Sequence, residues 1–185
     1  MLAFDEVQTG FGRTGANFAH QLYNVKPDIM GCGKAAGGGI LPVSFVAGRD
    51  DVIGTLTPGS EGSTFGGYPL ASVVGIYAIK TLIEENLAEN AKIRGKQLMK
   101  NFNDIMNDFP DKIKEVRGKG LLIGLCLQRD QTKFIQKLMD NKLLTVRAAE
   151  NVVRLLPPLN VTKQEINLGL KILDKVCKNY KWKIL

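Results

Sequence analysis

The chain reads Phe-Asp-Glu-Val-Gln-Thr-Gly at residues 4–10 and Gly-Lys-Ala-Ala-Gly-Gly-Gly at residues 33–39, and these two stretches decide the fold around them. A short apolar run precedes or begins each stretch, as is typical of a buried strand. Asp5 closes the first run, and Lys34 opens a glycine-rich turn after the second. The pattern predicts two strands whose ends form the halves of one site.

The residue types at this predicted site suit pyridoxal 5'-phosphate (PLP), a cofactor with a reactive aldehyde and a pyridine ring. A lysine forms a Schiff base with the aldehyde, and a carboxylate keeps the ring nitrogen protonated, which makes the ring an electron sink. The small neighbours of Lys34 leave room for a planar cofactor, and Asp5 needs a cationic partner at the end of a buried strand. The plainer interpretations are a solvated surface lysine and a structural or helix-capping acid.

Three further residues extend the predicted cofactor site. Val7 and Gln8 lie just beyond Asp5, so that an apolar side chain could pack on the ring face while an amide reaches the ring hydroxyl. The stretch Gly-Ser-Glu-Gly-Ser-Thr-Phe-Gly-Gly at residues 59–67 places Thr64 among glycines, where a hydroxyl can approach a phosphate closely. A plain turn is the alternative role of Thr64.

Arg154 is the candidate for binding a substrate. It lies on an apolar strand, directly before Leu-Leu-Pro-Pro-Leu at residues 155–159. A buried arginine needs an anion, and its planar fork suits a carboxylate through two parallel hydrogen bonds. The alternative for Arg154 is a structural salt bridge.

These segments, from Asp-Glu-Val-Gln-Thr-Gly-Phe-Gly-Arg-Thr-Gly at residues 5–15 to Val-Val-Arg-Leu-Leu-Pro-Pro-Leu at residues 152–159, together resemble the class III aminotransferases. The resemblance implies an α/β protein of PLP fold type I, the aspartate aminotransferase-like fold. It also implies that Lys34 carries the cofactor and moves the proton in transamination, and that Arg154 binds the substrate α-carboxylate. Since the family's threonine at the place of Thr64 reaches the cofactor of the neighbouring subunit, the resemblance further implies a homodimer.

The amino donor is predicted from smaller features of the same resemblance. The stretch at residues 143–159 most resembles acetylornithine aminotransferases of arginine biosynthesis, which predicts transfer from N-acetylornithine to 2-oxoglutarate. Two departures favour other members: one residue more than usual separates Lys34 from Pro42, as in ornithine aminotransferases, and Tyr68 replaces a common asparagine. The alternatives are therefore ornithine or 4-aminobutyrate transamination, or a non-catalytic fragment or assembly subunit.

The start of the sequence carries an expectation of its own. The first residues already belong to the predicted cofactor strand, and the family's N-terminal arm, main phosphate loop and ring-stacking aromatic residue do not precede them here. The chain is therefore expected to correspond to the C-terminal half of an aminotransferase. By itself, it is expected to bind PLP weakly and not to turn over.

The hydrophobic pattern changes after Pro110, which predicts two parts: residues 1–108 as the C-terminal part of the PLP-binding large domain, and residues 109–185 as a small α+β domain. The predicted strands span residues 1–4, 29–33, 43–47, 113–116, 121–127 and 152–155. The predicted helices span residues 69–85, 87–107, 132–141 and 163–180.

Composition excludes several classes of function. The net charge of +7 is spread over lysines without interleaved aromatic residues, so no nucleic acid partner is expected. No apolar run is long enough for a membrane span and no secretion signal is present, so a cytoplasmic location is expected. Cys32, Cys126 and Cys177 lie far apart and outside metal-ligand spacing, which predicts reduced core thiols and no metal.

Two remaining motifs favour plainer interpretations. Gly10, Gly12 and Gly15 match the dinucleotide pattern G-x-G-x-x-G, but Asp28 precedes the next predicted strand instead of ending it. A loop near the active site is the favoured role of these glycines. His20 is the only histidine, and no nucleophile elbow accompanies it, so a hydrolase triad is not expected.

Overall fold

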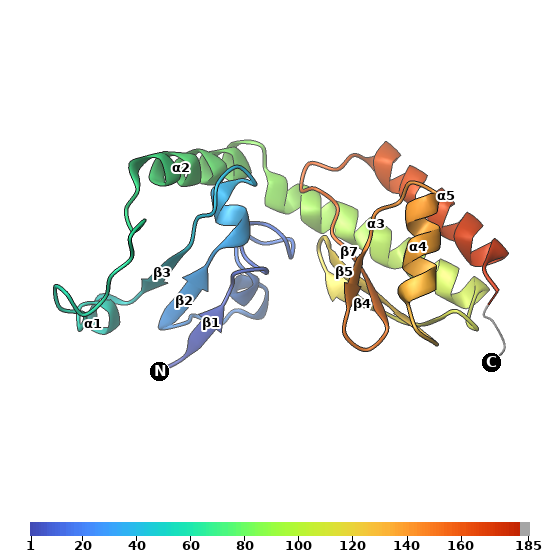
Figure 1. The fold of residues 1–185 in the computed structure, drawn as a ribbon, viewed down its shortest axis with the longest axis horizontal. Helices are drawn as coiled ribbons and strands as arrows, with labels where there is room; N and C mark the ends of the chain where they lie inside the picture. The colour runs from blue at the N-terminus through green and yellow to red at the C-terminus, as the bar shows by residue number, and fades with distance from the viewer. Residues whose placement is uncertain (182–185) are drawn as a thin grey trace. The chain divides into compact units, whose positions relative to one another are not determined.

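The structure is a computed structural model that describes residues 1–181 and shows an α/β chain (Figure 1). The chain divides into two compact units, one comprising Met1–Glu89 and one beginning at Asn90. The boundary that the sequence predicts, after residue 108, falls at the end of helix α3 (Leu87–Asp108), whereas the compact units divide near the beginning of this helix. Residues 182–185, which end the predicted small domain, lie outside the described residues.

A three-stranded sheet forms the centre of the first unit. Its strands are β1 (Ala3–Asp5), β2 (Ile29–Cys32) and β3 (Phe45–Gly48), in the order β1-β2-β3. β1 and β2 are parallel, and β3 is antiparallel to β2. Short helices join these strands and follow them: η1 (Ala19–Tyr23), η2 (Lys34–Gly37) and α1 (Asp50–Ile53). The parallel pair brings the carboxyl ends of β1 and β2 to one edge of the sheet.

Helix α2 (Pro69–Glu84) completes the first unit. Proline at the first helical position has a suitable fixed φ, and its missing N–H is not needed there. The helix packs on η2, since a Cβ atom added at Gly75 would lie 3.5 Å from the carbonyl oxygen of Ala36. Several large apolar side chains of α2 are nevertheless exposed: Leu70, Val73, Ile76, Tyr77 and Ile83. The first unit therefore carries an exposed apolar helix surface.

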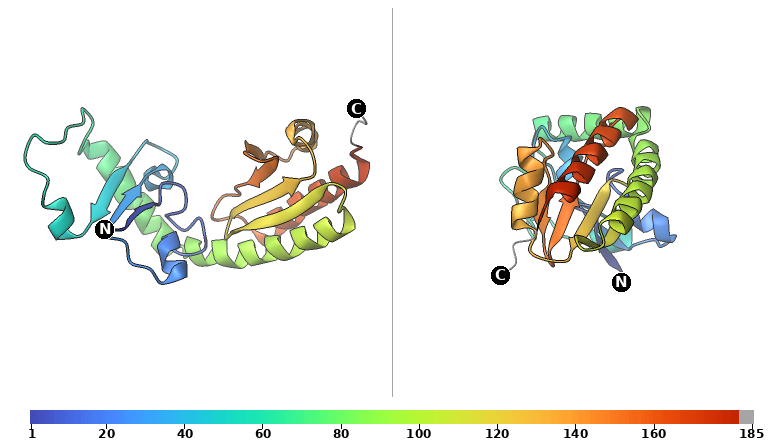
Figure 2. Two further views of the ribbon diagram at one scale, coloured as in Figure 1. Left: turned by 90° about the horizontal axis from the view of Figure 1, so that it is seen from below. Right: turned by 90° about the vertical axis from the view of Figure 1, so that its right-hand side faces the viewer.

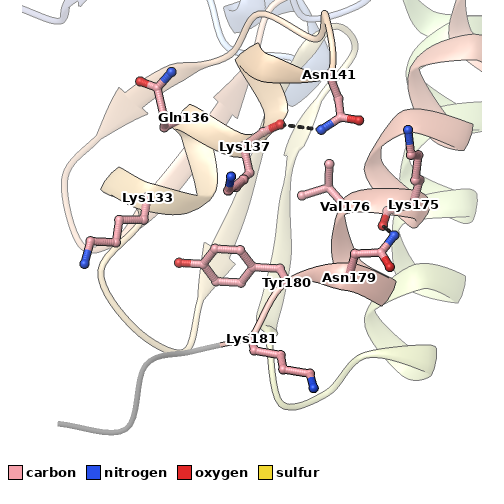
Figure 3. Close-up of a pocket in the computed structure, with 9 residues that line it drawn as sticks. All are labelled: Lys133, Gln136, Lys137, Asn141, Lys175, Val176, Asn179, Tyr180 and Lys181. Carbon is pink, nitrogen blue, oxygen red and sulfur yellow. Dashed lines mark hydrogen bonds between the residues drawn. The ribbon is translucent and has the colours of Figure 1, made fainter.

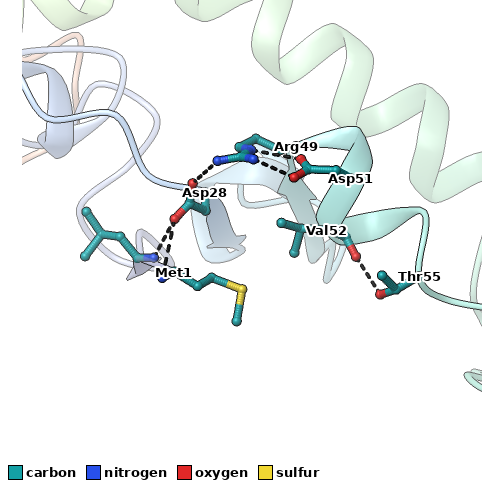
Figure 4. A network of polar contacts seen from close by, with 7 residues as sticks. Met1, Asp28, Arg49, Asp51, Val52 and Thr55 are labelled. Carbon is teal, nitrogen blue, oxygen red and sulfur yellow. Dashed lines mark hydrogen bonds and ion pairs between the residues drawn. The ribbon is translucent and has the colours of Figure 1, made fainter.

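A polar network joins the segments at the end of the first sheet where β1 and β2 begin (Figure 4). Asp28 Oδ2 accepts a hydrogen bond of 2.7 Å from the Leu2 N–H, and Asp28 Oδ1 accepts one of 2.8 Å from Arg49. Arg49 also binds the carboxylate of Asp51. The Leu2 N–H, first, and then the Arg49 guanidinium lower the pKa of the Asp28 carboxyl. One carboxylate thus joins the segments before β1, β2 and α1.

The second unit is built on a four-stranded sheet in the order β4-β5-β7-β6, with all neighbouring strands antiparallel. The strands are β4 (Ile113–Lys119), β5 (Leu122–Leu127), β6 (Val146–Ala148) and β7 (Val152–Leu155). Helices α3, α4 (Thr132–Asp140) and α5 (Lys163–Asn179) pack around this sheet (Figure 2).

A continuous apolar core holds the second unit together. Its largest fully buried side chains include Phe102 on α3, Phe134 and Leu138 on α4, and Leu173 on α5. Helix α3 approaches the turn before β5 very closely, because a Cβ atom added at Gly95 would lie 2.3 Å from the carbonyl oxygen of Gly120. Only a residue without a side chain fits at this crossing.

The predicted elements are confirmed with shifts of a few residues at their ends. β4 is longer than predicted, and the strand predicted at residues 43–47 is displaced to Phe45–Gly48. The expectation of a buried first strand is wrong, because Ala3 and Asp5 of β1 are exposed and Phe4 is half-buried. The sequence did not predict β6, α1 or η2 as separate elements, because each has three or four residues and lacks a periodic apolar pattern. Among residues 1–181, no helix is long and apolar enough to cross a bilayer.

Candidate active site

Asp5 and Lys34 come from the same edge of the first sheet. Asp5 is the last residue of β1 and pairs with Gly31 of the parallel strand β2, which ends one residue later. Lys34 follows the end of β2 by two residues and opens η2. In α/β sheets, ligands bind outside the carboxyl ends of parallel strands. The topology therefore places the predicted acid and the predicted lysine at such an edge.

The backbone of Lys34 has an unusual conformation. Its φ of 47° lies in the left-handed region, which a residue with a side chain adopts at a cost of about 1 kcal/mol. The two residues before it, Cys32 and Gly33, are buried, whereas Lys34 is exposed. Strained backbone of this kind clusters at functional sites, and here it follows the buried Cys32, which ends the half-buried strand β2.

Val7 and Gln8 begin the loop that leaves β1, and both are half-buried. The Val7 N–H donates a hydrogen bond of 2.9 Å to Asp5 Oδ1. A Cβ atom added at Gly33 would lie 3.3 Å from a methyl carbon of Val7, so Val7 packs against the residue that precedes Lys34. The structure thus brings Asp5, Val7 and the Lys34 turn together.

The glycines at positions 10, 12 and 15 shape a loop and do not open a long helix. Gly12 and Gly15 have φ values of 84° and 90°, which favour glycine. The loop leads to the short helix η1 instead of the long helix that a dinucleotide fingerprint requires. The rejection of that alternative agrees with the structure.

Thr64 lies in the exposed segment between α1 and α2. Its neighbours Ser63 and Phe65 line a cavity of about 610 Å³, together with residues 42–45 and residues of α2. The described residues place Thr64 beside this cavity, on the same unit as Lys34.

Arg154 lies on the second unit, in the interior strand β7, opposite Gly124 of β5 and Val146 of β6. Its side chain is half-buried, and the Nε atom is buried without a hydrogen-bond partner within the described part of the chain. A buried donor without an acceptor costs about 1–3 kcal/mol. An anionic ligand on this side chain would remove that cost.

Several other predicted features have structural roles. All three cysteines are buried free thiols, and burial raises the pKa of the Cys177 thiol to about 12, which makes a nucleophilic role unfavourable. Burial also raises the pKa of the Cys32 thiol, next to the Lys34 turn. The ring Nδ1 of His20 lies 2.8 Å from the carbonyl oxygen of Val25. Across residues 1–181, no group of histidine, cysteine and acidic side chains could hold a metal ion.

Glu6, the residue after β1, has a structural role in the site region. It is only 2% exposed, although it is charged. Its carboxylate accepts hydrogen bonds from Thr9 and from the first two N–H groups of η1. The sequence shows only that a charged residue directly follows an apolar strand. Its partners, Ala19 and His20, are thirteen and fourteen residues away in the sequence, so the local pattern does not reveal them.

A second cavity, of about 390 Å³, lies between α4 and α5 of the second unit (Figure 3). Lysines at positions 133, 137, 175 and 181 line it together with Tyr180, and no carboxylate does among the described residues. Lys137 pairs with Asp140 at 3.6 Å. The other charged groups lie on exposed helix surface, so this cavity is a solvated basic depression.

The fold and this sheet edge define a class of protein: the PLP-dependent enzymes of fold type I. Within that class, the model of the aminotransferase class-III family matches residues 1–177, and the chain belongs to this family. Class III aminotransferases use PLP as their cofactor.

Among curated relatives, the ornithine aminotransferase of Geobacillus sp. is 43% identical over 172 residues, which cover 93% of this chain and 42% of the relative. The acetylornithine aminotransferase of Oceanobacillus iheyensis is 37% identical over 176 residues, which cover 95% of this chain and 44% of the relative. The chain thus spans less than half the length of these relatives.

Solved structures give the same result. The chain is similar to Plasmodium falciparum ornithine δ-aminotransferase with a TM-score of 0.92 and 40% identity, over 96% of this chain and 46% of that one. It is similar to the acetylornithine aminotransferase of Elizabethkingia anophelis with a TM-score of 0.90 and 35% identity, over 95% and 45% of the two chains. The predicted fold class and family are therefore confirmed.

Proposed function

We propose that this chain supplies the lysine-bearing part of a PLP-dependent aminotransferase that transfers an amino group to 2-oxoglutarate. The observation that carries the proposal is the shared edge of β1 and β2, where Asp5 and Lys34 follow parallel strands. Asp5 Oδ1 accepts the Val7 N–H, and its second carboxylate oxygen is available to a ligand. Lys34 is exposed in a strained conformation, and Asp5 is exposed at the end of its strand.

The residues at this edge fit PLP. Lys34 Nζ would bond to the cofactor aldehyde, Asp5 would pair with the ring nitrogen, and Val7, packed against Gly33, would lie on the ring face. Gln8 would reach the ring hydroxyl. When bound, PLP supplies an electron sink next to the amino-bearing carbon.

Lys34 also has the chemistry for proton transfer. The Lys34 amine would serve as general base and acid, holding the proton that leaves the amino-bearing carbon of the substrate. The small residues of η2, of which Ala36 and Gly37 are buried, leave the amine room to move.

For the amino donor, the sequence at residues 143–159 supports N-acetylornithine. Arg154 would hold its α-carboxylate, which gives the buried Nε an acceptor. Ornithine is a second candidate, because the ornithine aminotransferase of Geobacillus sp. is more similar to this chain than the acetylornithine enzyme of Oceanobacillus iheyensis, at 43% against 37% identity.

We further propose a homodimer, with Thr64 contacting the cofactor phosphate of the partner. The exposed apolar side chains of α2 support this, since large exposed apolar surfaces mark interfaces. A cytoplasmic location is proposed as well, and the three free thiols support a reducing compartment.

The cofactor assignment is tested by titrating the 185-residue chain with PLP and recording the visible absorption band. We expect weak binding and a band that disappears in Lys34→Ala but persists in Lys80→Ala, which removes an exposed lysine of α2. An undiminished band in Lys34→Ala would reject the lysine assignment.

The donor is tested in the whole protein that carries these residues, with 2-oxoglutarate as acceptor. A larger kcat/KM for N-acetylornithine supports the first candidate, and a larger value for ornithine supports the second. Robust turnover by the 185-residue chain alone would contradict the expectation that it is inactive in isolation.

A further inference from the structure

The buried Glu6 carboxylate accepts three hydrogen bonds from groups that lie three to fourteen residues further along the chain. Its Oε1 accepts a hydrogen bond of 2.8 Å from the His20 N–H, and its Oε2 accepts one of 3.0 Å from the Ala19 N–H. The Thr9 hydroxyl also donates to Oε2. With 2% of its surface exposed, this carboxylate is satisfied by protein groups instead of water. It therefore caps the N–H groups that begin η1, which have no acceptor within the helix.

The main chain of Glu6 is held at the same time. Its N–H donates a hydrogen bond of 2.9 Å to the carbonyl oxygen of Gly31 on β2, and its carbonyl accepts one of 3.0 Å from the Gly10 N–H. A Cβ atom added at Gly10 would lie 2.8 Å from that carbonyl oxygen. One residue thus connects the sheet, the beginning of the loop at residues 7–18 and the end of that loop.

The loop that Glu6 closes begins with Val7 and Gln8, two of the residues proposed to contact the cofactor. Val7, its first residue, packs against Gly33 beside Lys34 and donates its N–H to Asp5 Oδ1. If the capped end of the loop were released, Val7 would lose its fixed position, and the Asp5 carboxylate would lose the hydrogen bond that orients it.

We propose that Glu6 is a positioning residue: by binding the first N–H groups of η1, it holds Val7 and the Asp5 carboxylate in the orientation that receives the cofactor ring beside Lys34. The Glu6 carboxylate binds Thr9 and the first N–H groups of η1, so Glu6 would act on the cofactor site only through Val7 and Asp5. The expected effect of Glu6 on PLP binding rests on the proposed function. Its effect on the positions of Asp5 and Val7 does not.

The test replaces Glu6 by glutamine, which keeps the shape and turns one acceptor oxygen into a donor facing an N–H group. The matched control is Glu84→Gln, an exposed acid at the end of α2. Hydrogen exchange of individual amides in the 185-residue chain is the first measurement. We expect Glu6→Gln to lose protection at Ala19, His20 and Val7, and the control to lose none of them. Retained protection at Val7 after loss at Ala19 and His20 would overturn the proposal.

PLP titration is the second measurement, made on Glu6→Gln, Asp5→Asn and the double variant. Loss of hydrogen bonds to a charged group corresponds to about tenfold weaker PLP binding for Glu6→Gln. Because part of the Glu6 effect passes through the Asp5 carboxylate, Glu6→Gln should weaken PLP binding by a smaller factor in the Asp5→Asn background than in the wild type. Effects of the two substitutions that multiply independently would contradict the positioning role.

The two measurements separate this inference from the proposed function. If Val7 loses protection as expected while PLP binding does not depend on Lys34, the positioning of Asp5 by Glu6 stands and the cofactor assignment fails. If PLP binding depends on Lys34 but Val7 is unaffected by Glu6→Gln, the proposed function stands and the positioning role fails.

Discussion

The two units of the chain differ in how they bury their apolar residues. The second unit encloses a continuous core in which Phe134, Leu138 and Leu173 are fully buried. The first unit leaves Phe65 78% exposed, Ile40 75% exposed and Tyr77 64% exposed. The residues proposed to hold PLP lie on this first unit, where turns, glycines and hydrogen bonds fix the geometry more than a core does. The first unit therefore leaves large apolar side chains exposed, whereas the second unit encloses a continuous core.

Truncation of one aromatic side chain in each unit should change the free energy of unfolding by very different amounts. Phe134→Ala empties a fully buried aromatic site and should destabilise the second unit by about 3–5 kcal/mol. Tyr77→Ala, on the exposed surface of α2, should change stability by about 0.5 kcal/mol or less. Urea unfolding of both variants provides the measurement. Similar losses in both would show that the first unit buries its apolar residues as fully as the second.

A second comparison uses glycines. Gly95→Ala places a Cβ atom against the backbone of Gly120 and should cost about 1–3 kcal/mol. Gly169→Ala in α5 meets nothing closer than a Leu143 methyl at 3.7 Å and should stabilise by about 0.5–1 kcal/mol. Gly75→Ala, in α2 of the first unit, makes ordinary contacts of 3.5 Å or more. By the same reasoning it should stabilise by about 0.5–1 kcal/mol, and a cost as large as that of Gly95→Ala would reveal tighter packing in the first unit.

Arg154 provides a functional comparison between the units. Arg154→Lys removes the planar fork and should raise the KM of the amino donor about tenfold or more in the whole protein, with much less effect on PLP affinity. Asp5→Asn, on the first unit, should instead weaken PLP binding strongly and change the KM of the amino donor much less. The KM of the donor and the Kd of PLP are therefore measured for both variants. Equal losses in both quantities for Arg154→Lys would count against its carboxylate-binding role.

The smallest expected effect concerns Asp28 and acid. Because its folded-state pKa is lowered by the Leu2 N–H and by Arg49, its contribution to stability is present above the ordinary aspartate pKa, near 4, and is lost as pH falls through the lower folded pKa. Asp28→Asn should therefore be less stable than the wild type at pH 7, and the difference should shrink towards pH 3. Denaturant midpoints at the two pH values check this, and a difference that grows in acid would contradict it.

The sequence was sufficient for features that depend on local pattern. Apolar runs ending at Asp5 and Lys34 predicted β1 and β2, and Pro69 marked the beginning of α2. The family resemblance, carried by residues 5–15 and 152–159, predicted the fold class and the cofactor.

The remaining features depend on tertiary contacts. Strand β6 has three residues at a sheet edge, so its pairing with β7 is decided by register and not by its own pattern. The cap that Glu6 provides to η1 joins residues thirteen and fourteen positions apart. The unpartnered Nε of Arg154 is visible only once burial is known.

The central claim, that Lys34 carries the cofactor, is tested most directly by mapping where PLP attaches. The 185-residue chain is incubated with less than one equivalent of PLP, the linkage is fixed with borohydride, and each lysine-containing peptide is quantified by mass spectrometry. We expect the modification to concentrate on Lys34, and we expect Lys34→Ala to remove it without increasing the modification of other lysines. Modification spread over the exposed lysines and unchanged in Lys34→Ala would show that Lys34 does not carry the cofactor.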